Sequence, residues 1–339
     1  MLRPFFHASV CALLITPAPD GLQLGVAEGE TIRRSISLTV ERQLDNISQL
    51  VNGEDRSGDG SDRSQSSTNA LEIVVVDQIQ AAVDGKPTKV LRRYEAIGAE
   101  VSQESSFRGE SNSTEVSLVS ELEGEEVLFT FEEDEWTPTL VDGSSLDEAY
   151  LVELAASMDL EVILPDGDAT EGDEWEAPVD LLDSLTRPGG ELGLHSEEEE
   201  NYEIAETRPV TQRSGTITVT HAGTSEEDEN LIVLDLAFDT ASTTDLADVM
   251  REQFDSLPDS SGMAPEVDSA LRSTEAEGSG QALWNSKAGR LESFTFEIEI
   301  SEVMDQVFRV HTPDSGEFII ESTQESSGTA SGEIIQGAG

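Results

Sequence analysis

Cysteine is almost absent from this chain of 339 residues, since the only one is Cys11, near the N-terminus. A chain with one thiol forms no internal disulfide and has no cysteine-based zinc site, and beyond position 11 it has no thiol nucleophile. Aromatic residues make up only 5% of the chain, which argues against the aromatic platforms of a sugar-binding cleft. Without an internal disulfide or a cysteine-based zinc site, the fold must be held together by its core.

Positive charge is also scarce. Nineteen Lys and Arg residues stand against 71 Asp and Glu, which gives a net charge of -52, and only three of the cations are lysines. A surface this acidic repels phosphate backbones and anionic lipid headgroups, so nucleic-acid binding is excluded, and cations and basic partners are favoured. The acids are spread along the chain, which is typical of a solvated coat rather than of one recognition patch.

Signatures of catalysis are missing as well. The chain contains no G-x-S-x-G elbow, no P-loop and no G-x-G-x-x-G, so acyl transfer and nucleotide chemistry have no local support. The four histidines are far apart and lack the i, i+4 spacing of a zinc-binding helix. We therefore predict no catalytic and no cofactor-binding residue, although the many carboxylates leave a two-carboxylate hydrolase open.

The N-terminus has the pattern of a secretory signal. Met1-Leu2-Arg3 is a short positive start, and an apolar stretch follows from Phe5 to Ile15. That stretch of about 11 residues is too short to span a bilayer, which needs about 20, so we expect an exported protein, periplasmic or extracellular. We predict cleavage after Ala27, with Ala18 as the second choice. The alternative is an ordinary buried segment in a cytoplasmic protein.

Alternation of apolar and polar residues predicts a mostly β protein. The clearest examples are 32–40, 232–238 and 294–300, where apolar side chains share one parity and polar ones the other. Such segments predict antiparallel sheets with one wet face. We interpret 277–280, with its two glycines, as a turn between strands. The predicted fold class is α+β, mostly β, with curved, half-barrel-like antiparallel sheets and one helix packed on each of two halves.

Two segments have helical spacing instead. They are 145–159, with Ser144 and Ser145 as candidate caps, and 243–256, with Thr244 as the candidate cap. Without a signal at residues 1–27, the chain is still longer than one compact core usually accommodates. A glycine-rich and acidic stretch near residue 195 predicts a boundary. We expect an N-terminal β domain at 28–195 and a C-terminal β domain at 196–339.

Two oxygen-rich stretches are candidates for metal binding. The first has donors at positions 1, 3 and 5 of a loop with glycine at position 6, as calcium loops do, but serine stands at position 12, where a bidentate glutamate belongs. The second has a similar density of oxygens and no recognised spacing. Both predict weak divalent-cation binding at most, with a polar hairpin tip as the alternative. The candidate ligands are Asp55, Ser57, Asp59, Asp166 and Asp168.

Four short motifs follow one another after a strand that opens at Gly29-Glu30. They are D-G-K-P-T-K at 84–89, L-E-G-E-E-V-L-F at 122–129, L-P-D-G-D-A-T-E-G-D-E-W at 164–175 and A-L-W-N-S-K-A-G-R-L at 282–291. In this order they resemble the uncharacterised exported proteins of planctomycete-type bacteria. The resemblance covers most of the chain after the signal and implies export, and it carries over no activity.

Three functions stay open. The leading hypothesis is a non-catalytic exported binding or scaffolding module for an apolar small molecule, held in a sheet cavity as in periplasmic lipid carriers, or for an envelope protein; the lipid-carrier comparison is an analogy of fold alone. The second is a carboxylate-based hydrolase, with or without a divalent cation, which requires inward acids with raised pKa in a deep cleft. The third is a salt-adapted structural protein that salt stabilises by screening self-repulsion.

Overall fold

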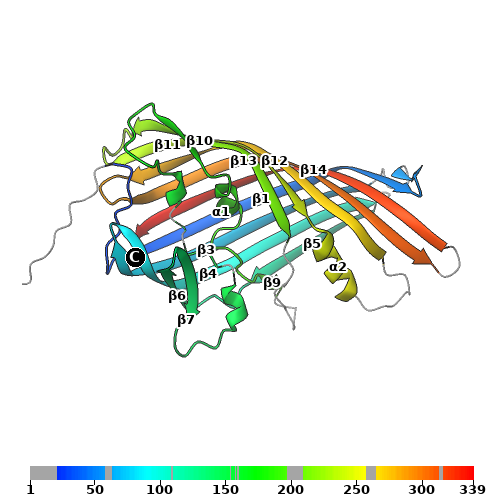
Figure 1. Cartoon of the computed structure of the whole chain (residues 1–339), viewed down its shortest axis with the longest axis horizontal. Helices are drawn as coiled ribbons and strands as arrows, with labels where there is room; N and C mark the ends of the chain where they lie inside the picture. Colours follow the sequence, from blue (N-terminus) through cyan, green and yellow to red (C-terminus); the bar gives the residue numbers. More distant parts are fainter. Residues whose placement is uncertain are drawn as a thin grey trace, which may run out of the picture.

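The computed structural model describes residues 21–57, 63–107, 110–152, 154–156, 158, 160–196, 209–256, 265–312 and 316–339. Most of them are in strands, with two α-helices and short 3-10 turns (Figure 1). The strands are β1 (Thr31–Val51), β2 (Glu54–Asp55), β3 (Arg63–Val83), β4 (Lys86–Phe107), β5 (Glu110–Val119), β6 (Glu126–Glu132), β7 (Glu135–Leu140), β8 (Glu174–Ala177), β9 (His195–Ser196), β10 (Val210–Thr224), β11 (Leu231–Asp245), β12 (Pro265–Asn285), β13 (Arg290–Thr312) and β14 (Gly316–Ala338). The helices are η2 (Glu148–Leu151), η3 (Glu161–Ile163), α1 (Leu181–Thr186) and α2 (Ala247–Ser256).

All 14 strands belong to one antiparallel sheet, which confirms the prediction of a mostly antiparallel β protein. The order is β7-β6-β4-β3-β1-β14-β13-β12-β11-β10-β8, with β2, β5 and β9 paired beside it. Since β7 and β8 lie at opposite ends of this order, the sheet is open. The first and last long strands, β1 and β14, are neighbours in its middle, with Ile36 opposite Ile334.

The strands are much longer than the sequence pattern predicts. Six of them have 21 to 23 residues, which corresponds to about 70 Å of extended chain. The predicted turn at 277–280 is wrong, because β12 runs straight through it. A Cβ on Gly278 would lie 2.3 Å from the carbonyl oxygen of Glu297, so this glycine permits the close approach of β13 rather than a reversal of the chain.

The predicted boundary at residue 195 falls between two halves of the same sheet. Strands β1 to β7 come from the first half and β10 to β14 from the second, and the pairing of β1 with β14 joins them. The halves therefore share backbone hydrogen bonds along the whole length of these two strands. As a boundary between separate folding units, residue 195 stays a prediction.

Residues 141–196, which we call the strap, connect the two ends of the sheet over one of its faces. The strap starts after β7 at one end, reaches β8 beside β10 at the other end, and returns to β9 beside β5. Figure 1 shows α1, in the middle of the strap, lying over the central strands. We call the face beneath the strap the inner face. The part of the sheet that the strap covers is the covered half, and the remainder is the open half.

The hydrophobic core lies between the strap and the covered half. Inward side chains such as Ile73, Phe294 and Ile298 form one buried cluster with Leu154, Ile163 and Leu181 of the strap. A much smaller cluster in the open half joins α2 to β12 and β13 through Ala247, Val267 and Ala270, with Met250, Phe254 and Phe308 packed around it. The two helices thus pack against opposite halves of one sheet.

The segment before β1 belongs to the core as well. Leu22, Leu24 and Val26 are all buried. The amide of Val26 donates to the carbonyl of Gly85 (3.1 Å), and the amide of Gly25 donates to the carbonyl of Gly289 (2.9 Å), so this segment ties two hairpin turns together. Cleavage after Ala27 would remove it, whereas cleavage after Ala18 would keep it.

Helix placement is only partly as predicted. The helix expected at 243–256 is present as α2, but it begins at Ala247. The helix expected at 145–159 is wrong, because the described part of that segment contains only the single turn η2. There the strap runs across the sheet with buried Leu154, Ala156 and Met158, which satisfies the apolar pattern without a helix. Helix α1 was not predicted.

Candidate functional site

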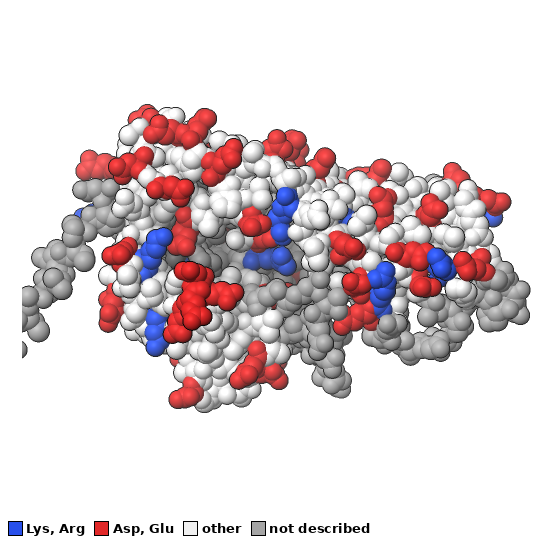
Figure 2. Space-filling view, in the orientation of Figure 1, with Lys and Arg blue, Asp and Glu red and all other residues white. Residues whose placement is uncertain are grey.

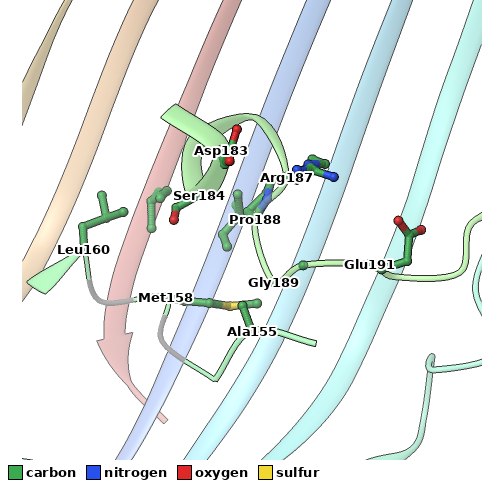
Figure 3. Close-up of a pocket in the computed structure, with 12 residues that line it drawn as sticks. Ala155, Met158, Leu160, Asp183, Ser184, Arg187, Pro188, Gly189 and Glu191 are labelled. Atoms are coloured by element: carbon green, nitrogen blue, oxygen red, sulfur yellow. The ribbon is translucent and has the colours of Figure 1, made fainter. Parts of the chain in front are cut away.

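A pocket of about 210 Å³ lies between the strap and the inner face. Its floor is formed by Ile36 and Ile334, which face each other across the seam of β1 and β14. Met158, Leu160 and Pro188 of the strap form apolar walls (Figure 3). The pocket is thus lined jointly by β1, β14 and both passes of the strap, and no one of these segments forms it alone.

The mouth of the pocket is polar. Asp183 and Ser184 come from α1, and Arg187 and Glu191 come from the strap immediately after it. Figure 2 shows this face of the molecule with basic side chains beside a central hollow, surrounded by acidic side chains. An apolar interior with a few polar groups at the opening is the usual composition of a small-molecule site.

A charged cluster beneath the strap fixes the position of the pocket wall. Asp77 accepts hydrogen bonds from Arg92 at 2.7 and 2.8 Å and a further one from Arg34. The three side chains lie on β1, β3 and β4, and their exposed fractions are 1% for Arg34, 2% for Asp77 and 0% for Arg92. Charges this deeply buried are tolerated only when they are paired and hydrogen-bonded.

Arg92 also binds the strap. Its Nη1 donates to the carbonyl of Ala155 (2.8 Å) and its Nη2 donates to the carbonyl of Ala156 (2.7 Å), while the guanidinium lies 5.1 Å from the ring centroid of Phe129. Ala155 lines the pocket, and its amide donates to Gly189 in the other pass of the strap (2.9 Å). Arg92 therefore clamps one pass of the strap to the sheet directly and the other pass through the backbone of Ala155.

The ionisation of this cluster follows from burial and charge. Burial acts to raise the pKa of Asp77, but the charges and hydrogen bonds of Arg92 and Arg34 outweigh it and hold the pKa below its ordinary value. Burial raises the pKa of Tyr94, which is 0% exposed beside Arg92. Since the pKa of Asp77 is lower in the folded state than the unfolded value of about 3.9, its stabilisation is present above that pH and is lost as pH falls through the folded pKa.

The predicted metal ligands do not come together. Asp55 accepts a hydrogen bond from the amide of Ser57 (2.8 Å), and hydrogen bonds from Ser57 lower its pKa. Asp166 and Asp168 are exposed on the strap, and Asp59 lies outside the described residues. In the described part of the chain, no three His, Asp or Glu side chains are grouped as a metal ion would require.

Two residues of this charged cluster, Asp77 and Arg92, have a signal in the sequence, although they were not among the predicted site residues. Asp77 shares its parity with Ile73 and Val75, and Arg92 shares its parity with Val90 and Tyr94. A charged residue on the apolar face of a strand must find a partner when the strand is buried. Which partner it finds depends on strand order. The hydrogen bonds from Arg92 to the two strap carbonyls involve backbone groups, so a pattern of side chains cannot predict them.

Comparisons with known proteins show no family. No protein-family model matches this chain, and no curated protein matches it. Two crystal structures of Pseudomonas aeruginosa proteins are among the solved structures found. OccD3 (OpdP) has 10% identity over 95% of both chains with a TM-score of 0.15, and OccK11 (OpdR) has 8% identity over 92% of this chain and 98% of that chain with a TM-score of 0.14. At these TM-scores neither likeness carries an argument about fold or function. Within the described residues, no helix has the length and apolar character needed to cross a membrane.

Proposed function

We propose that this protein is a non-catalytic, exported binding protein that holds a small apolar or amphipathic molecule in the pocket beneath the strap. The observation that carries this proposal is the apolar pocket on the Ile36–Ile334 seam, with its polar mouth. At about 210 Å³ the pocket is smaller than the roughly 300–1,000 Å³ of drug-sized sites, so it suits one short chain or a small aromatic molecule.

Support for a binding role also comes from the rigidity of the walls. Arg92 fixes Ala155, and the amide of Ala155 fixes Gly189, so the strap residues around the pocket are held by hydrogen bonds to buried groups. A preformed site loses less conformational freedom on binding than one that must be ordered by its ligand. The half-barrel comparison with lipid carriers, the exported location and an envelope-protein partner remain parts of this proposal.

A carboxylate hydrolase receives less support. Such an enzyme needs an acid whose pKa is raised. The carboxyl groups of the described chain that show a clear pKa shift are Asp55, Asp77, Asp173 and Asp228, and in all four the pKa is lowered by hydrogen bonds or neighbouring cations. The apolar pocket is therefore the better guide to function.

The experiment measures binding of the uncharged fluorophore N-phenylnaphthylamine, together with native mass spectrometry of the protein isolated from its own source. Ala155→Phe places a ring in the pocket while leaving the backbone hydrogen bonds of Ala155 intact. We expect it to weaken binding at least about tenfold, which corresponds to about 1.4 kcal/mol. The matched control is Ala237→Phe, since Ala237 is exposed on the outer face of β11.

Equal binding by wild type and Ala155→Phe would place the fluorophore elsewhere and remove the support for this site. Circular dichroism and the urea midpoint of both variants must match those of wild type, so that lost binding is not confused with lost folding. A retained apolar molecule in the native mass spectrum supports the proposal, and its displacement by the fluorophore assigns it to the same pocket.

A further inference from the structure

Two oppositely charged side chains stand at the mouth of the pocket, on either side of a tight turn. Pro188 and Gly189 are the central residues of this turn, which the amide of Gly190 closes by donating to the carbonyl of Arg187 (3.1 Å). Gly189 has a φ of 82°, as the second central position of a type II turn requires. A Cβ at Gly189 would also lie 2.5 Å from Cε of Met158, so any other residue would both strain the backbone and displace the end of that side chain.

This turn places Arg187 and Glu191 on the same side of the pocket, opposite Leu160 (Figure 3). Each side chain lines the pocket, and the two are not within ion-pair distance of each other. The rigid turn between them keeps their backbones apart while both side chains reach the mouth. The arrangement thus presents two separate charges of opposite sign rather than one neutralised pair.

Both charges are unengaged in the part of the chain that the structure describes. Neither Arg187 nor Glu191 makes a hydrogen bond or an ion pair there through its side chain. This is unusual for an arginine of this protein, since others such as Arg33 and Arg290 contact a carboxylate. The third charged group at the mouth, Asp183, is already bound by Arg213. One cation and one anion are left for a ligand.

We propose that the pocket takes a zwitterionic amphiphile: a single short acyl or alkyl chain with a head group of the phosphocholine or phosphoethanolamine type. This rests on the proposed function and adds the class of ligand. The chain occupies the apolar space above Ile36 and Ile334, the phosphate lies against Arg187, and the ammonium lies against Glu191. An anionic head alone meets Glu191 and the overall negative field, and a cationic head alone meets Arg187.

The experiment compares four amphiphiles that each have an eight-carbon chain: octylphosphocholine, octanoate, octyltrimethylammonium and octyl glucoside. Each is titrated below its micelle concentration against N-phenylnaphthylamine bound to the protein, at low ionic strength. Exposed charge pairs are individually weak, so we expect octylphosphocholine to bind about two- to thirtyfold more tightly than the uncharged glucoside. The two singly charged compounds should show less gain than the zwitterion.

Two variants make the assignment specific to these residues. Arg187→Gln should shift the preference toward octyltrimethylammonium, and Glu191→Gln should shift it toward octanoate, while the affinity for octyl glucoside stays unchanged in both. The control is Arg93→Gln, which removes an exposed arginine of the outer face.

If all four compounds bind alike, or if octanoate or octyltrimethylammonium binds best to wild type, the head-group proposal is overturned and the apolar pocket stands. If neither the fluorophore nor any octyl compound binds, the proposed function itself fails.

Discussion

The covered and open halves of the sheet are built from the same strands but bury very different side chains. On the inner face of β13, Phe294, Phe296 and Ile298 are buried in the covered half, whereas Glu302 and Gln306 occupy the same face in the open half. The antiparallel pairing with β14 continues without a break across both. Backbone pairing therefore does not depend on burial in this sheet, whereas the fully buried apolar side chains of β13 all lie in the half that the strap covers.

The comparison also explains where a site can form. The covered half has the strap as a broad second layer, and a pocket with apolar walls needs two layers. The open half has α2 over β12 and β13, with a small cluster of its own. Its inward residues elsewhere, such as Gln65 and Ser67 on β3, are polar enough to face solvent. The ligand site, the charged clamp and most of the core thus lie within the same part of the molecule.

The largest effect should come from removing the segment before β1. A chain that starts at Glu28 lacks Leu22, Leu24 and Val26, which are buried in the covered half. Each such side chain contributes about 1.5–3 kcal/mol of burial, so the free energy of unfolding should fall by several kcal/mol relative to a chain that starts at Gly21. Urea denaturation of the two chains measures the difference. Equal midpoints would show that the covered half does not need this segment and would make cleavage after Ala27 compatible with the fold.

The next effect tests the clamp that holds the strap to the covered half. Arg92→Met keeps most of the side-chain volume but leaves Asp77 with one of its two arginines and frees the carbonyls of Ala155 and Ala156. Breaking a buried ion pair in this way costs about 3–5 kcal/mol. The control is Arg93→Met on the same strand, whose arginine is 52% exposed and should change stability by about 0.5 kcal/mol or less. If the two variants have the same urea midpoint, Arg92 does not clamp the strap.

How much of this could be predicted from the sequence depends on whether the signal is local. Alternation identified the strand at 294–300, which is part of β13 in the structure. The pairing of β1 with β14 and the crossing of the strap are contacts between distant segments, and no local pattern encodes them. For that reason the pocket could not be predicted, since its floor is the β1–β14 seam and its walls belong to the strap. For the same reason the apolar strap segment at 145–159 was predicted to be a helix.

A matched pair on one strand sharpens the comparison of the halves. Ile298 and Met304 both face inward on β13, the former buried in the covered half and the latter half-buried in the open half. Ile298→Ala should lower the free energy of unfolding by about 2–5 kcal/mol, because it leaves a cavity under the strap. Met304→Ala should cost about 1 kcal/mol or less, since solvent replaces part of the lost contact. Similar costs in urea denaturation would mean that the open half is as tightly packed as the covered one.

The smallest effect concerns the outer face, where no strap lies and the acidic surface acts on itself. Asp239, Glu277 and Glu299 are exposed and directly opposite one another on β11, β12 and β13. Like charges in this register are destabilising by about 0.2–1 kcal/mol, so Glu277→Gln should stabilise the protein at low salt. The gain should disappear in 1 M NaCl, where the screening length is about 3 Å. Glu333→Gln is the control, because Glu333 has Ser37 and Thr295 as its opposite neighbours. A gain of equal size in both variants would point to the net charge of -52 as a whole rather than to this row, and a gain that persists in 1 M NaCl would show that charge repulsion is not its cause.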